Sequence, residues 1–163
     1  MTEESQHQTL PRTFRSLEEV RAACGETVGT SAYRTVSQEM VDGFADITAD
    51  HEWLHVDLAR AADGPFGTTI AHGFLTLSLL AGFAAEIFRL EVDVATMNYG
   101  LDRVRFISPL LTGSRVRARA AFESVEPHAA GHILRLDYML EIEGETKPAC
   151  VAQALLLMLS TPV

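Results

Sequence analysis

The chain has 163 residues, 47% of them hydrophobic, which is enough to bury one compact core. Thirteen basic against 22 acidic residues give a net charge of −9, which argues against nucleic acid or an anionic membrane surface as the main partner. The amino-terminal residues show no hydrophobic signal region, and the longest uncharged stretch near the most apolar segment, residues 73–85, is too short for the roughly 20 residues of a membrane span. We therefore expect a cytoplasmic protein.

The chain starts with a predicted tail and a short helix. Residues 1–11 are polar and end on a proline, as a flexible tail does, and residues 12–163 form one predicted domain. Ser16 and Glu19 have the spacing of a capping box, so a short helix should start there and run to about residue 23.

A strand and a longer helix come next. Residues 27–36 are rich in Thr, Val and Tyr, which predicts a strand. Ser37 is a good amino-terminal cap, and the apolar residues behind it keep helical spacing up to Ile47. This helix should end near Asp50, which places Asp50 at the mouth of the following loop.

Seven titratable side chains then crowd into fewer than 30 residues: Asp46, Asp50, His51, Glu52, His55, Asp57 and His72. Such a cluster beside a buried element is a candidate site for acid–base chemistry. On a continuous helix Asp50 and His55 would lie about 140° apart around the axis, so they can cooperate only if a turn separates them. Trp53 and Leu54 could anchor that turn, and Asp57 should cap a short helix to Ala62.

The second half of the chain predicts one long helix and an antiparallel sheet. Residues 74–90 are apolar on every face, which indicates a buried helix. Period-two alternation or continuous apolar sequence then predicts strands over residues 97–107, 116–122, 134–142 and 149–159. Short turns between these strands make them antiparallel. The expected fold is α+β, with one antiparallel sheet wrapped around the helix, and Cys150 is expected to be a small core residue.

Residues 51–55 fit the H-E-x-x-H pattern of zinc peptidases, in which two histidines on one helix ligate zinc. The pattern needs a helix straight through these residues, whereas the apolar periodicity stops at Ile47. The metzincin extension is also missing, since Leu58 and Ala61 stand where it has Gly and His. We therefore predict no metal site.

Residues 49–55, 64–66 and 70–78 together resemble the MaoC-like dehydratases, the (R)-specific enoyl-CoA hydratases, and most of all their NodN-like branch. Residues 104–113 also resemble this family. The family signature is roughly G-D-x-N-P-x-H. Asp50 and His55 match its catalytic pair, while Ala49, Glu52 and Trp53 replace its Gly, Asn and Pro.

The resemblance implies a hot-dog fold, a homodimer that could associate further, and addition of water to a trans-2-enoyl-CoA to give the (R)-3-hydroxyacyl-CoA. Asp50 and His55 would hold the water, and the Gly73 N–H would form the oxyanion hole. No cofactor is implied beyond the CoA of the substrate. We further predict that Ile70, His72, Phe74 and Arg105 contact the substrate.

Several alternatives remain open. His72 could instead shape the loop, and Arg103 and Arg105 could form structural ion pairs rather than bind the phosphates of CoA. The whole chain could also be a hot-dog acyl-CoA thioesterase or a non-catalytic subunit that binds acyl-CoA.

Overall fold

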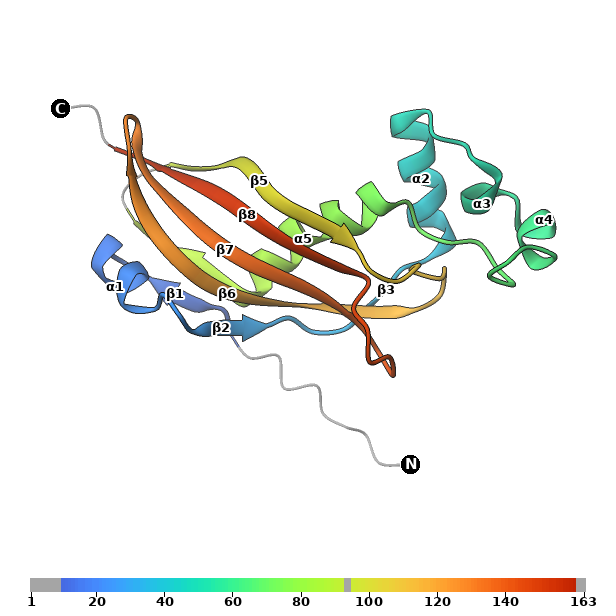
Figure 1. The fold of residues 1–163 in the computed structure, drawn as a ribbon, viewed down its shortest axis with the longest axis horizontal. Helices are drawn as coiled ribbons and strands as arrows, with labels where there is room; N and C mark the ends of the chain where they lie inside the picture. The colour runs from blue at the N-terminus through green and yellow to red at the C-terminus, as the bar shows by residue number, and fades with distance from the viewer. Residues whose placement is uncertain (1–9, 93–94, 161–163) are drawn as a thin grey trace.

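An antiparallel sheet curves around one long helix, α5 (Gly73–Ile87), as Figure 1 shows. The computed structural model describes residues 10–92 and 95–160. The predicted α+β arrangement, a sheet wrapped around a long helix, is confirmed. The predicted tail, residues 1–11, lies mostly outside the described residues, so the boundary between tail and domain stays a prediction.

Six strands form the main sheet, in the order β2-β6-β7-β8-β5, and β3 pairs with β6 along the same edge as β2. They are β2 (Thr27–Thr30), β3 (Arg34–Thr35), β5 (Thr96–Phe106), β6 (Arg115–His128), β7 (Gly131–Ile142) and β8 (Cys150–Leu159). Every pair in this sheet is antiparallel, as predicted. A separate parallel pair joins β1 (Arg12–Phe14) to β4 (Phe88–Leu90).

The alternation of residues along β6 explains how the sheet buries one face. Val116, Ala118 and Ala120 are fully buried and point toward α5, while the arginines between them point to the other face. On β7, Leu140 opposite Ala118 and Leu136 opposite Phe122 are fully buried as well. The face of the sheet toward α5 therefore forms the core, and the opposite face carries the charged side chains.

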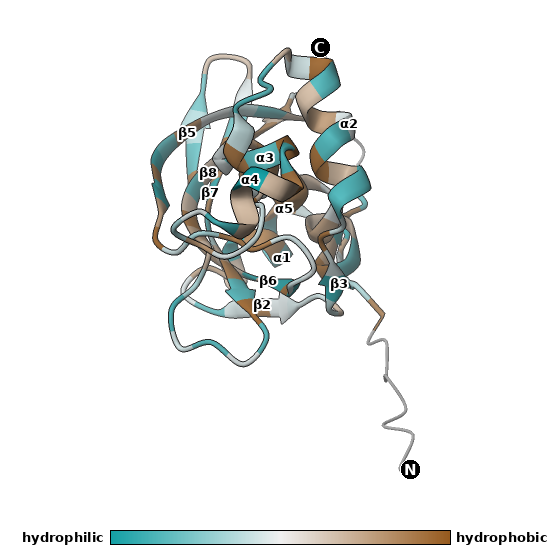
Figure 2. Cartoon of the chain, turned by 90° about the vertical axis from the view of Figure 1, so that its right-hand side faces the viewer, coloured by the Kyte–Doolittle hydropathy of each residue, from teal (hydrophilic) through white to brown (hydrophobic). Residues whose placement is uncertain are grey.

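The other helices are α1 (Leu17–Ala22), α2 (Gln38–Thr48), α3 (Trp53–Val56) and α4 (Leu58–Ala62). The side chains of Ser16, Ser37 and Asp57 each accept a backbone N–H at the start of a helix, which confirms the three predicted caps. Helices α2, α3 and α4 gather at one end of the sheet, next to the amino-terminal end of α5 (Figures 1 and 2). This end of the molecule holds the predicted titratable cluster.

The predicted strand over residues 27–36 is wrong in its middle, because the chain leaves the sheet between β2 and β3. The hydroxyl oxygen of Ser31 accepts the N–H of Ala118 at 2.9 Å, and the same hydroxyl donates to the carbonyl of Ala32 at 3.0 Å. A side chain thus takes the place of a main-chain acceptor and interrupts the ladder.

The predicted helix over residues 74–90 is too long, and it is not buried on all sides within this chain. The helix ends at Ile87, and the last three residues form β4, which pairs with β1. One face of α5 is exposed, and its residues follow helical spacing: Phe74, Ser78, Ala81 and Ala85. The reason is geometric, since the sheet covers only one side of the helix.

None of the helices in the described ranges is both long and apolar enough to cross a membrane. The predicted cytoplasmic location stays a prediction. Cys150 is fully buried, as expected of a core residue, and its burial raises the pKa of the thiol to about 11.

Candidate active site

A turn separates Asp50 from His55, as the sequence predicted. Helix α2 ends at Thr48, and Ala49 adopts the left-handed conformation with φ of 59°. This residue reverses the chain direction, so Asp50 lies in an exposed loop rather than on the helix. Helix α3 starts at Trp53 and carries the half-buried His55 back toward the same place.

The side chains of Asp50, His55 and His72 meet at this turn. A carboxylate oxygen of Asp50 and one ring nitrogen from each histidine all lie within 4.8 Å of one another. When one water molecule donates a hydrogen bond of ordinary length to each of two acceptors, the two acceptors are about 4.5–5 Å apart. The predicted pair is therefore brought within the reach of one shared water.

The backbone contact of His55 determines which of its nitrogens carries a proton. Its Nδ1 lies 2.7 Å from the carbonyl oxygen of Ile70, and a carbonyl can only accept, so Nδ1–H is the donor. In the neutral ring Nε2 is then unprotonated and can accept a proton. Ile70, predicted as a substrate contact, thus uses its main chain to orient His55.

His72 is 2% exposed and lies between the elements of the site. Its Nε2–H donates to the carbonyl oxygen of Asp50 at 2.9 Å, and its ring stacks on the ring of His55 with centroids 3.7 Å apart. Phe44 of α2 also contacts His72, with the centroids of the two rings 5.1 Å apart. The Nδ1 atom of His72 is buried and has no hydrogen-bond partner among the described residues.

Gly73 begins α5 directly after His72. The first N–H groups of a helix have no partner within the helix, and the helix dipole makes this end positive. A Cβ atom at Gly73 would lie 2.9–3.1 Å from the ring of Phe106, so only glycine fits here without displacing that ring. The predicted contact residue Phe74 follows at the mouth of the site and is 70% exposed.

A polar network that the sequence did not reveal holds the backbone of α3. The side-chain amide of Gln38 donates to the carbonyl oxygen of His55 at 2.8 Å. The hydroxyl of Thr69 donates to the Gln38 carbonyl oxygen at 2.5 Å and lies 3.0 Å from the hydroxyl of Thr112. The two links made by Thr69 join residues 31 and 43 positions apart in the sequence, so no local pattern signals them.

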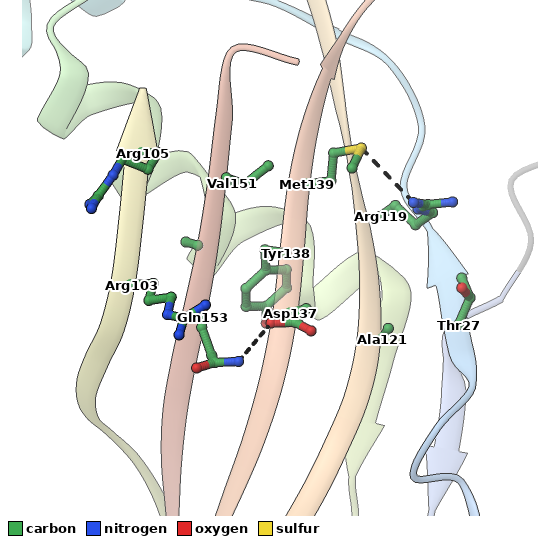
Figure 3. Close-up of a pocket in the computed structure, with 11 residues that line it drawn as sticks. Thr27, Arg103, Arg105, Arg119, Ala121, Asp137, Tyr138, Met139, Val151 and Gln153 are labelled. Atoms are coloured by element: carbon green, nitrogen blue, oxygen red, sulfur yellow. Dashed lines mark hydrogen bonds between the residues drawn. The ribbon is translucent and has the colours of Figure 1, made fainter. Parts of the chain in front are cut away.

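Arg105 lies on the opposite face of the sheet from α5. It faces Val151 of β8, whereas its neighbour Val104 faces Ala152 in the core. Figure 3 shows it at one side of a groove of about 870 Å³, with Arg119 across from it and α5 behind the strands. The structure therefore does not bring Arg105 to the cluster formed by Asp50 and His55.

The zinc-peptidase alternative does not fit this geometry. His51 precedes α3, so it does not share a helix with His55, and its ring bonds the carboxylate of Asp46 at 3.0 Å instead. His55 and His72 also make a poor metal pair, because their rings are stacked at 28°. Metal–nitrogen bonds of about 2.0–2.1 Å lie in the ring plane, and the planes of two stacked rings do not meet that close to the rings.

Comparison with known proteins identifies the family. The model of the MaoC like domain matches residues 19–135. The chain belongs to the MaoC-like family. The predicted membership, which rested on residues 49–55, 64–66, 70–78 and 104–113, is thereby confirmed.

Among curated proteins, this MaoC-like chain is 48% identical to 3-hydroxyacyl-thioester dehydratase Z of Mycobacterium tuberculosis, over 88% of the chain and 96% of that protein. It is 44% identical to nodulation protein N of Rhizobium leguminosarum bv. viciae, over 84% and 87% of the two chains. The structure of an (R)-hydratase of Pseudomonas aeruginosa superposes with a TM-score of 0.67 at 20% identity, over 83% of each chain. The chain is thus a homologue of a hydro-lyase, and its predicted hot-dog fold is confirmed.

Proposed function

We propose that this MaoC-like protein is an (R)-specific enoyl-CoA hydratase, which adds water to a trans-2-enoyl-CoA and catalyses the reverse dehydration. The observation that carries the proposal is the convergence of Asp50 and His55 beside the start of α5, within the reach of one water molecule. The 48% identity to a protein named as a 3-hydroxyacyl-thioester dehydratase supports the same reaction class.

In the proposed mechanism, Asp50 and His55 hold the reacting water between them. The unprotonated Nε2 of His55 takes one proton as the water oxygen bonds to C3 of the substrate. The Asp50 carboxylate accepts a hydrogen bond from the other O–H, which stays on the water oxygen, and it stabilises the positive charge that develops on the His55 ring. His55 then returns its proton to C2, so OH adds to C3, H adds to C2, and both side chains end as they began.

Gly73 has the complementary role in this proposal. As water adds, negative charge moves onto the thioester oxygen, and the Gly73 N–H at the positive end of α5 would donate to it. Because Gly73 has no side chain, the ring of Phe106 packs directly against this part of the backbone and would flank the bound thioester. Phe74, exposed beside it, is the proposed contact for the thioester arm.

An apolar cavity of about 620 Å³ lies between α5 and strands β5 and β8, and we assign the acyl chain to it. Its lining begins at Leu77, one helical turn beyond Gly73, and continues past Ala81 and Ala84 toward Leu101 and Leu156. An acyl chain that starts at the oxyanion hole would therefore run along the helix.

The proposed active unit is a homodimer, because the chain leaves one continuous apolar surface uncovered. Strand β5 has nearly every residue exposed, and the large side chains of Met97, Tyr99 and Leu101 are about half exposed. Among the described strands it pairs only with β8, so its other edge is open to a second copy. The exposed face of α5 lies across the cavity from β5, and a second copy would cover both.

Arg105 enters the proposal only as a contact for the distant, phosphate-bearing end of CoA. It forms no ion pair with another described residue, and its side chain bonds only the neighbouring carbonyl of Val104. A modest rise in KM for CoA esters on Arg105→Ala, with kcat unchanged, is the expected result.

The test is the loss of the enoyl-thioester absorbance of crotonyl-CoA with wild type, Asp50→Asn and Asp46→Asn. Acid–base catalysis of this kind contributes roughly 10²–10⁴-fold to kcat, and Asp50→Asn removes the carboxylate that holds the water and stabilises the charged His55 ring, so this variant should be nearly inactive. Asp46→Asn is the matched control, since Asp46 is exposed, lies four residues earlier and, among the described residues, pairs only with His51. Substantial activity of a folded Asp50→Asn protein would refute the assignment, and thiol release without hydration would indicate a thioesterase.

A further inference from the structure

We infer that His72 is a positioning residue: in its neutral Nε2–H form it holds the Asp50 loop against the start of α5 and fixes the ring of His55 for proton transfer. This inference rests on the proposed function for its effect on rate. The protonation of Nε2 and the contacts of His72 with Asp50 and His55 can be tested without measuring any activity.

The first step is that His72 contacts both members of the proposed pair and exposes almost none of its own surface. Its Nε2–H bonds the main chain of Asp50, and its ring covers one face of the His55 ring. At 2% exposure it has little surface left for a substrate, which favours positioning over the substrate contact that the sequence suggested.

The second step concerns its protonation. The contact to a carbonyl requires the proton on Nε2, and Nδ1 is buried without a partner among the residues described. A second proton on Nδ1 would bury an unpaired N–H and a positive charge against the His55 ring. Neutral His72 instead leaves His55 free to become positively charged during the reaction.

The third step is the connection to the oxyanion hole. His72 is the residue before Gly73 and the amino-terminal cap position of α5, where its carbonyl accepts the N–H of Thr76 at 3.0 Å. One rigid side chain therefore links the water-holding loop, the base and the N–H at Gly73. Displacing reacting groups by about 1 Å costs on the order of 10²-fold in rate, so the loss of this link should be visible in kcat.

Two substitutions separate the two contacts. His72→Gln keeps an N–H near the position of Nε2 but removes the ring that stacks on His55, and His72→Phe keeps a ring but removes the donor to Asp50. We expect each to lower kcat roughly 10- to 100-fold while KM, and the Kd of the unreactive butyryl-CoA, stay within about twofold. His51→Gln is the matched control on the same loop, because the exposed ring of His51 bonds the Asp46 carboxylate and, among the described residues, makes no hydrogen bond to His55 or His72, so it should leave kcat unchanged.

Two measurements stand apart from turnover. Nitrogen-15 NMR of the wild-type histidine rings at pH 8 should show the proton of His72 on Nε2 and that of His55 on Nδ1. Hydrogen exchange of residues 49–53 should speed up in His72→Phe but not in His72→Gln.

Unchanged kcat in both variants, a rise in KM or Kd alone, or an Nδ1–H on His72 would each overturn the inference. If His72→Phe fails to fold, His72→Gln and the wild-type spectrum still decide it. If the wild type hydrates no enoyl thioester, the proposed function fails, while the NMR and exchange results still test the positioning role.

Discussion

At the scale of single residues, the site depends on which atoms of the histidines are already engaged. The Ile70 carbonyl holds a proton on Nδ1 of His55, and the Asp50 carbonyl holds one on Nε2 of His72. Two stacked rings of the same chemical type are therefore placed in opposite tautomers. One presents a free nitrogen as a base, and the other acts as a buried donor.

Gly73→Ala is the residue-scale test of the oxyanion hole. The new methyl group would displace the ring of Phe106, which is about half exposed and free to move, so we expect the free energy of unfolding to change by less than about 1 kcal/mol. The activity should nevertheless fall tenfold or more, since the displaced ring would shift the thioester away from the N–H. Gly82→Ala on the same helix meets only Arg34, at 3.5 Å, and should retain full activity. Equal kcat/KM for the two variants would contradict the role of Gly73.

His51 gives a prediction about pH. The hydrogen bond to Asp46 raises the pKa of the His51 ring from its usual 6.5, so the folded state binds this proton more tightly than the unfolded state. Its stabilisation is therefore complete below about pH 6.5 and disappears as the pH rises through the raised pKa. Wild type should have a slightly higher Tm than His51→Gln at pH 5.5 and the same Tm at pH 8.5. A difference that grows with pH would have the wrong sign.

At the scale of elements, the caps and the central helix could be predicted because their signals are local. Ser37, Asp57 and the apolar run after Gly73 each act within a few residues. The Gln38–Thr69–Thr112 network and the break at Ser31 could not be predicted, since they depend on contacts between segments 31–87 residues apart. Asp50 and His55 could be identified from their short spacing and from the resemblance. The contact between His55 and the main chain of Ile70 could not, because it joins two separate segments.

The end of α2 explains one departure from the family signature. Ala49 stands where that signature has Gly, and it adopts the left-handed conformation, with φ of 59°, that glycine accepts at least cost. Ala49→Gly should therefore raise the free energy of unfolding by about 0.5–1 kcal/mol, as measured by urea denaturation, with the turn between Asp50 and His55 retained. A decrease in the free energy of unfolding would contradict this prediction. It would mean that packing of the Ala49 methyl group stabilises the fold by more than the left-handed backbone conformation destabilises it.

At the scale of the whole molecule, the exposed face of α5 beside the exposed strand β5 shows that α5 is not fully buried within one chain, although its apolar sequence predicted a buried helix. The apolar residues that the sequence presents on every side of α5 make sense if the proposed second copy covers the side that the sheet leaves open. The acyl cavity opens on that same side, so association would also close it to water. The two proposals, dimer and acyl site, are therefore linked.

Leu101→Glu tests that link. Leu101 is 47% exposed on β5 and lines the cavity, so a charge there should prevent the apolar faces from meeting. Light scattering after size exclusion should give the mass of a dimer for wild type and of a monomer for Leu101→Glu. Leu58→Glu is the control, since Leu58 is 59% exposed on α4, away from this surface. A monomeric wild type would contradict the proposed dimer.

The central claim is that Asp50 and His55 direct one water molecule to C3 of an enoyl thioester. The most direct measurement incubates crotonyl-CoA with the protein in ¹⁸O-labelled water and locates the label by mass spectrometry. We predict one ¹⁸O in the C3 hydroxyl of an intact 3-hydroxybutyryl-CoA with wild type and almost none with Asp50→Asn. Label in the carboxylate of a released acid would contradict the claim, because the same site would then be directing water to the thioester carbonyl.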